Sequence, residues 1–106
     1  MMSGGGLDES TALRCVAEPA VRAMKVLANE DRLLIVHQLS RGELCVGELE
    51  RLLGIHQPTL SQQLGILRAE RVVATRREGK QVFYRIADAR LLEILATLHR
   101  FYAPPA

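Results

Sequence analysis

The stretch from Gln57 to Ile86, QPTLSQQLGILRAERVVATRREGKQVFYRI, decides the fold class of this chain of 106 residues. Its first part, residues 57–69, predicts a helix with one buried stripe at helical spacing, made of Leu60, Leu64 and Leu67. Two β-rich runs follow at residues 72–77 and 81–86, and the segment 78–80 between them contains a glycine, as a hairpin turn does. The stretch therefore predicts a short helix followed by a basic β-hairpin.

A second short helix precedes this stretch. Residues 43–45 are predicted to be extended and to lead into a helix over residues 46–53, which Gly54 ends. Before them, Asn29 is a good N-cap for a helix that stops near Gly42. Two short helices joined around a glycine and followed by a basic hairpin form the pattern of a winged helix-turn-helix. We therefore predict a mainly α-helical domain with a small β-hairpin wing.

Longer helices are predicted at both ends of this domain. Residues 9–28 have a helical pattern around Pro19, which predicts a kink or a division into two pieces. Asp88 is predicted to cap a last helix with an apolar face. The expected organisation is a disordered N-terminal tail over residues 1–8, one domain over 9–103 and a C-terminal tail over 104–106.

The net charge of +2 is unevenly distributed along the chain. Residues 1–61 carry six Lys or Arg against eight Asp or Glu, whereas residues 62–106 carry eight against four. A basic half on a nearly neutral chain favours a polyanionic partner. The first residues lack the layout of a secretion signal, no apolar run reaches membrane-spanning length, and two cysteines make no disulfide framework. We therefore expect a cytoplasmic protein with reduced thiols and no membrane partner.

The exposed face of the predicted recognition helix is polar and short-chained. With the leucine stripe buried, Gln62 points away from the core, whereas Gln63 lies nearer the buried edge. The candidate base-contacting residues are Gln57, Thr59, Ser61, Gln62 and Gln63. The candidate phosphate-contacting residues are Arg68 after the helix and Arg76, Arg77 and Lys80 around the hairpin tip. The sequence therefore predicts a surface for double-stranded DNA.

Two stretches, LANEDRLLIVHQL at residues 27–39 and the run from residue 42 to residue 86, resemble the arsenic-repressor/SmtB (ArsR/SmtB) family of bacterial metal- and redox-responsive repressors. The resemblance covers roughly residues 20–102. QPTLSQQLGILR at residues 57–68 and LHRFY at residues 98–102 are most similar to its sulfide- and biofilm-responsive branch. The resemblance implies a winged-helix homodimer that reads an inverted repeat.

In this family the first and last helices form the dimer interface. The apolar faces of the same two helices in this chain agree with that arrangement, since a small domain gains from covering them. The implied interface residues are Leu13, Val16, Leu91, Ile94, Leu95, Leu98, Phe101 and Tyr102.

The inducer sites of the family match this chain incompletely. Arsenic-type members carry a second cysteine where this chain has Gly47. Zinc-type members begin the last helix with Asp-x-His, where this chain has Asp-Ala-Arg at residues 88–90. The cysteine pair of the sulfide-responsive branch aligns with His37 and Ala103. One zinc-type pattern, a cysteine followed three residues later by an acid, survives in Cys45 and Glu48.

Cys15, in the first helix, would add a soft ligand from its own or from the other subunit. Two cysteines and a carboxylate suit zinc or another soft metal ion, so Cys15, Cys45 and Glu48 are the candidate metal or redox site. The two cysteines would equally suit a disulfide or a polysulfide bridge. Free cysteines also pack as small buried hydrophobes, which is the alternative interpretation. No cofactor is therefore fixed by the sequence.

These patterns favour a sequence-specific transcriptional repressor, homodimeric on an inverted-repeat operator. A metal ion or a thiol-reactive sulfur or redox signal would release it from DNA. The alternative is a ligand-independent DNA-binding regulator whose cysteines only pack. The chain carries no Ser/His/Asp set, paired carboxylates, phosphate-binding loop or CxxC motif, so we expect no enzymatic activity.

Overall fold

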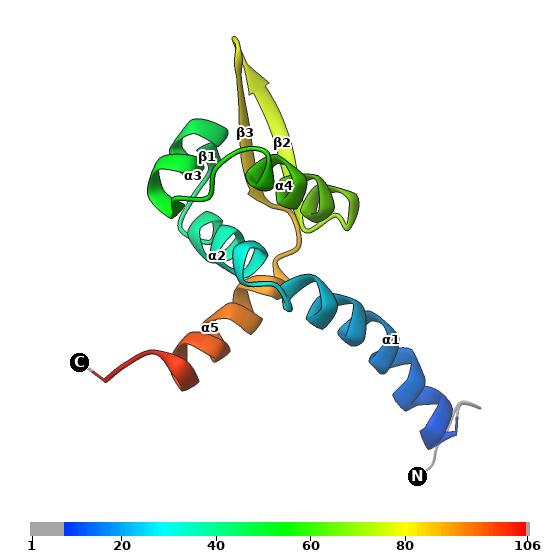
Figure 1. Cartoon of the computed structure of the whole chain (residues 1–106). Helices are drawn as coiled ribbons and strands as arrows, with labels where there is room; N and C mark the ends of the chain where they lie inside the picture. Colours follow the sequence, from blue (N-terminus) through cyan, green and yellow to red (C-terminus); the bar gives the residue numbers. More distant parts are fainter. Residues whose placement is uncertain (1–7, 106) are drawn as a thin grey trace.

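The computed structural model describes residues 8–105, so the predicted disorder of residues 1–7 lies outside the described residues. The described chain forms, in order, α1 (Glu9–Leu27), α2 (Glu30–Leu39), β1 (Leu44–Cys45), α3 (Val46–Leu53), α4 (Thr59–Ala69), β2 (Val73–Glu78), β3 (Gln81–Ile86) and α5 (Arg90–Tyr102). The helices α2, α3 and α4 form a compact group beside the sheet, while α1 and α5 lead away from it (Figure 1).

The three strands form one antiparallel sheet in the order β1-β3-β2. Thr75 of β2 pairs with Tyr84 of β3, and Cys45 of β1 pairs with Phe83 on the other edge of β3. Gly79 has a φ of 62°, which a glycine adopts without a steric penalty, and it lets β2 turn directly into β3. The resulting hairpin projects beyond the helices (Figure 1), which confirms the predicted wing.

The core lies between α2, α3, α4 and the base of the sheet. The predicted leucine stripe of α4 is fully buried there, since Leu60, Leu64 and Leu67 are at most 1% exposed. Ile35 and Leu49 bring α2 and α3 to the same cluster. Burying a leucine side chain contributes roughly 1.5–3 kcal/mol. The helix pair and the wing are therefore held by one aliphatic core, and the predicted winged helix-turn-helix is confirmed.

Several predicted element boundaries are wrong by one or two residues. Asp8, assigned above to the tail, is the N-cap of α1, because its carboxylate accepts a hydrogen bond from the Thr11 N–H at 2.7 Å. The N-cap of α5 is Ala89 rather than Asp88, although the Asp88 carboxylate accepts from the Arg90 N–H. The helix α4 begins at Thr59, two residues later than predicted.

Of the two outcomes predicted at Pro19, a kink or a division of the helix, the division is wrong. The helix α1 runs unbroken from Glu9 to Leu27 with Pro19 inside it. Proline removes one backbone hydrogen bond from a helix interior, and the turns on either side keep theirs. Asp8 at the start and Lys25 in the last turn both suit the helix dipole, which favours one long element.

The two terminal helices leave much of their apolar surface uncovered. On α1, Leu13 and Val16 are 67% and 64% exposed, and on α5, Phe101 and Tyr102 are 70% and 81% exposed. The radius of gyration is 16.9 Å, against about 13 Å for a compact domain of 100 residues. The extended helices account for this difference (Figure 1).

One part of the predicted interface requires correction. Leu91 and Leu95 of α5 are 2% and 5% exposed, because they pack into the core of their own chain. They are therefore unavailable to a partner. Ile94, on the outer side of the same helix, stays exposed, as do Phe101 and Tyr102.

Candidate nucleic-acid interface

The outer face of α4 is open to solvent along its length. Ser61, Gln62, Gly65 and Arg68 are all exposed, while Thr59 is half-buried. A Cβ atom added at Gly65 would have no neighbour within 4 Å outside its own helix. The chain itself therefore does not require a glycine there, and the small surface leaves room for another molecule to approach the helix backbone.

Gln57 and Gln63 have partners within the chain. The Gln57 side-chain oxygen accepts a hydrogen bond from the Ser61 N–H at 3.0 Å, which satisfies one free donor in the first turn of α4. The Gln63 side-chain oxygen accepts from Arg32 Nη1 at 2.9 Å. Both amides therefore help to fix α4 in place. Gln62 remains the exposed side chain whose amide has no such partner among the described residues.

Arg32 is a structural residue that the sequence analysis missed. Besides Gln63, its guanidinium donates to the carbonyl oxygens of Val26 at 2.7 Å and Lys25 at 3.2 Å, at the end of α1. These carbonyls carry the negative end of the α1 dipole, so a cation is favourable there. The position of Arg32 in the first turn of α2 was the available signal. A cation there lies at the positive end of its own helix dipole, so it is stable only with hydrogen-bond acceptors from another part of the chain.

The wing carries two neighbouring arginines in different environments. Arg76 binds Glu43 through Nε at 2.7 Å and Glu78 through Nη1 at 2.9 Å, and its guanidinium lies 4.6 Å from the centre of the Phe83 ring. The hydrogen bonds to Glu78 and Glu43 raise the pKa of Arg76. Arg76 therefore fastens the hairpin to the segment before β1, and its charge is largely matched.

Arg77 points to the other side of the hairpin, because neighbouring residues of a strand alternate between its faces. That side carries Tyr84 and Ile86, which pack against the core that α4 shares. Arg77 is exposed and forms no ion pair within residues 8–105, and Lys80 at the turn is likewise exposed. Arg77 and Lys80 therefore place unmatched charge toward the tip of the hairpin, with Arg77 on the side of α4, while Arg85 of β3, also exposed and without an ion pair among the described residues, lies on the side of Arg76.

The pair Cys45 and Glu48 forms a helix cap. The Glu48 carboxylate accepts a hydrogen bond from the backbone N–H of Cys45 at 3.0 Å, as the third residue of a capping box does. This hydrogen bond lowers the pKa of Glu48. The spacing that suggested two metal ligands is thus also the spacing that starts α3. Cys45 itself is half-buried beside β3.

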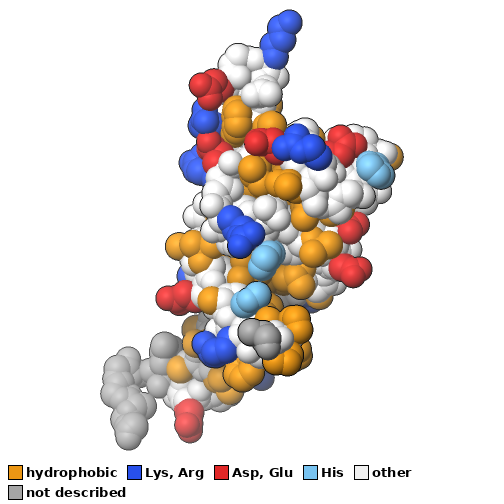
Figure 2. Space-filling view, turned by 90° about the vertical axis from the view of Figure 1, so that its left-hand side faces the viewer, with side chains coloured by type: hydrophobic (Ala, Val, Ile, Leu, Met, Phe, Trp, Pro, Cys, Tyr) orange, Lys and Arg blue, Asp and Glu red, His pale blue; other side chains and the backbone are white. Residues whose placement is uncertain are grey.

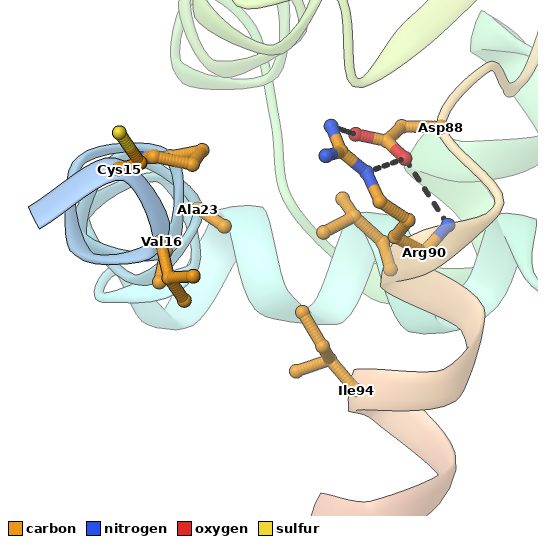
Figure 3. A pocket seen from close by; sticks show the side chains of 9 residues that line it. Cys15, Val16, Ala23, Asp88, Arg90 and Ile94 are labelled. Atoms are coloured by element: carbon orange, nitrogen blue, oxygen red, sulfur yellow. Dashed lines mark hydrogen bonds and ion pairs between the residues drawn. The ribbon is translucent and has the colours of Figure 1, made fainter. Parts of the chain in front are cut away.

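Cys15 lies elsewhere, at a cavity of ≈ 380 Å³ between α1 and the start of α5. Figure 3 shows Cys15 and Val16 on the α1 side of this cavity and Ile94 on the α5 side. The strand β1, which carries Cys45, lies far from α1 (Figure 1). Within residues 8–105 no three His, Cys, Asp or Glu side chains gather as a metal site. The structure therefore does not bring together Cys15, Cys45 and Glu48 in one chain.

The start of α5 carries an ion pair at the same cavity. Arg90 donates from Nε and Nη2 to the Asp88 carboxylate at 2.9 and 2.8 Å (Figure 3). The hydrogen bond from the Arg90 side chain lowers the pKa of Asp88. The Asp88 carboxylate is therefore already paired with a guanidinium.

Comparison with known proteins identifies the family. A family model described as "Bacterial regulatory protein, arsR family" matches residues 29–75. The biofilm growth-associated repressor of Agrobacterium fabrum is 48% identical over 82 residues, which span 77% of this chain and 70% of that protein. The chain belongs to the arsR family. Other relatives include a transcriptional activator and HTH-type transcriptional repressors, so the predictions of a DNA-binding regulator and of no enzymatic activity are confirmed.

Solved structures of similar proteins share the fold. The crystal structure of the transcriptional repressor BigR from Xylella fastidiosa is 39% identical, with a TM-score of 0.86 over 92% of this chain and 100% of that chain. The homodimeric winged helix-turn-helix DNA-binding domain of Mb0332 from Mycobacterium bovis is 30% identical, with a TM-score of 0.72 over 92% and 88% of the two chains. Among residues 8–105, no helix is long and apolar enough to span a membrane.

Proposed function

We propose that this chain is a cytoplasmic transcriptional repressor that binds an inverted-repeat operator as a homodimer. The observation that carries the proposal is the exposed polar face of α4 beside Arg77 and Lys80, two unmatched charges toward the tip of the wing. Such a helix enters the major groove, while the basic wing contacts phosphates or the minor groove. Gln62 is the central base-contacting residue, since an exposed amide both donates to and accepts from base edges.

The uncovered apolar faces of α1 and α5 support the homodimer. Leu13 and Val16 on α1, and Ile94, Phe101 and Tyr102 on α5, expose apolar surface that a second copy would bury. A two-fold dimer places its recognition helices about 34 Å apart, one turn of DNA, and so reads two half-sites of opposite direction.

Fluorescence anisotropy with the DNA upstream of the gene tests the DNA-binding part. Gln62→Ala should lose roughly 1–3 kcal/mol of binding free energy on the operator, and the variant protein should discriminate less between operator variants. Gln38→Ala, an amide on α2 outside the proposed interface, is the matched control. If Gln62→Ala loses the same affinity for the operator and for unrelated DNA, then Gln62 does not contact the bases.

A second function, release from DNA by a metal ion or by a thiol-reactive sulfur or redox signal, is favoured by the exposure of Cys15. Cys15 is one of the residues that line the cavity between the two helices proposed to form the dimer, so a modification of its thiol would act close to the proposed interface. Cys45 and Glu48 are the remaining candidates, with zinc or another soft ion as the ligand.

The test of release compares three proteins on the same DNA: wild type, Cys15→Ser and Cys45→Ser. Each is measured reduced and metal-free, then with zinc, arsenite or polysulfide. If an effector releases wild type from the DNA but leaves one cysteine variant bound, the cysteine replaced in that variant is the sensing residue. Equal binding in every condition would favour the ligand-independent regulator.

A further inference from the structure

Two histidines from different helices lie against each other on the surface. His37 of α2 and His99 of α5 have ring centres 6.0 Å apart and ring planes inclined by 26°. In Figure 2 two neighbouring histidine side chains lie beside hydrophobic side chains on one face of the molecule. The two residues are 62 positions apart in the sequence (99 − 37), so the packing of α5 on α2 brings them together.

Neither imidazole ring has a polar partner within the described residues. Among residues 8–105, neither ring makes a hydrogen bond or an ion pair, although the backbone carbonyls of both residues accept hydrogen bonds. His56 differs, because its Nδ1 lies 3.5 Å from a Glu50 carboxylate oxygen. Both His37 and His99 are exposed, so their ring nitrogens are open to solvent and to ions.

We propose that His37 and His99 bind one late divalent transition-metal ion, such as Zn²⁺, Ni²⁺ or Cu²⁺. Imidazole nitrogen is a favoured ligand for these ions. Two imidazoles at about 2.0–2.1 Å from one ion have ring centres roughly 5–6 Å apart, close to the spacing found here. The rings are nearly parallel, so each must rotate about its bond to Cβ, a torsion with broad freedom in histidine. Water completes the coordination shell at this exposed position.

The apolar surroundings strengthen such a site on one side. A groove of ≈ 490 Å³ between α2 and α5 is lined by the two histidines and by Leu33, Leu34, Leu95, Leu98, Tyr102 and Ala103. These side chains keep water from the inner side of the ion, and a low local dielectric strengthens its interaction with the ring nitrogens.

The ion would fix the outer half of α5. Leu91 and Leu95 hold the first turns of α5 in the core, but Phe101 and Tyr102 beyond them are exposed. His99 lies between these two parts, one turn past Leu95. An ion shared with His37 therefore joins the outer half of α5 to α2. The effect on the dimer and on DNA rests on the proposed function, whereas uptake of the ion does not.

Isothermal titration calorimetry with Zn²⁺ tests the site directly. The protein is the full chain without a histidine tag, freed of metal and kept reduced. The Cys15→Ser/Cys45→Ser double variant, which lacks the proposed cysteine site, should bind one ion per chain at the histidine pair, and adding the control change His56→Ala should leave that binding unaltered. Added to the same double variant, His37→Ala and His99→Ala should each weaken binding by at least about tenfold, the usual loss when even a supporting residue of a metal site is removed.

Hydrogen exchange gives a second readout that needs no DNA. Zn²⁺ should slow amide exchange over residues 96–102 of wild type and leave His99→Ala unchanged. Unchanged Zn²⁺ affinity in both histidine variants, no Zn²⁺ binding by wild type, or loss of binding in the cysteine double variant alone would each overturn the proposal. Since both histidines are exposed, circular dichroism of the variants should match wild type.

Discussion

The helices α4 and α1 carry similar apolar stripes and bury them to opposite degrees. Leu60, Leu64 and Leu67 of α4 are at most 1% exposed, whereas Leu13 and Val16 of α1 are more than 60% exposed. A stripe at helical spacing shows that one face of a helix is suited to burial. It does not show whether the same chain or another copy covers that face. The structure separates the two cases.

The largest expected effect tests the buried member of this comparison. Leu64→Ala should lower the free energy of unfolding by about 2–5 kcal/mol, because it leaves a cavity in the shared core. Urea denaturation followed by circular dichroism measures it. The loss should be the same at every protein concentration, since the cavity lies within one chain. A loss below about 1 kcal/mol would mean that the core is less closely packed than described.

The next effect concerns the exposed member. The double variant Val16→Asp/Ile94→Asp should be monomeric at concentrations where wild type is dimeric, because charges in a two-fold interface meet their own copies. Sedimentation velocity measures the change, and circular dichroism should show the helices retained. Leu52→Asp is the matched control, since Leu52 is an exposed apolar residue on α3, outside both terminal helices. A variant that remains dimeric would place the interface elsewhere.

A smaller effect contrasts the two arginines of the wing. Arg77→Ala should weaken binding to every duplex and reduce the slope of log affinity against log salt concentration by about one, because its unmatched charge is proposed to contact a phosphate. Arg76→Ala should lose its links to Glu43 and Glu78 and lower the stability of the hairpin, with little change in the slope. Anisotropy titrations at several salt concentrations distinguish them. An equal change of slope for both would contradict the different roles assigned here.

The smallest effect is expected at Gly65 on the open face of α4. Gly65→Ala should stabilise the isolated protein by about 1 kcal/mol, since alanine favours helix and the added Cβ has free space. Operator binding should weaken if the helix backbone lies close to DNA. Thermal unfolding and anisotropy measure the two effects. Stronger or equal binding by this more stable protein would show that the DNA does not approach this turn.

Much of the fold was predictable because its signals are local. Asn29 at the start of α2, Gly54 at the end of α3 and Gly79 in the hairpin each mark a boundary through their own backbone preference. The course of α1 through Pro19 was not predictable in this way. Its outcome depends on whether the helical turns on both sides outweigh one missing hydrogen bond.

The candidate sites were predictable only in part, because pairings across the fold have no local signal. The outward direction of Gln62 follows from the leucine stripe of α4. The hydrogen bond from Arg32 to Gln63 and the contact between His37 and His99 do not follow from any spacing in the sequence. They depend on the packing angles of whole helices.

The Arg32 guanidinium also has a mechanical consequence. It holds the last carbonyls of α1 and the side chain of Gln63 on α4 at the same time. The helix α1, proposed to face the partner subunit, and the helix α4, proposed to enter the DNA groove, are therefore both held by the planar guanidinium of Arg32. In a dimer, any rotation of α1 against its partner would be passed through this fork to the distance between the two recognition helices. A lysine has a single ammonium and cannot hold three acceptors in that fixed plane, so the spacing of the two half-sites would depend on the shape of one arginine.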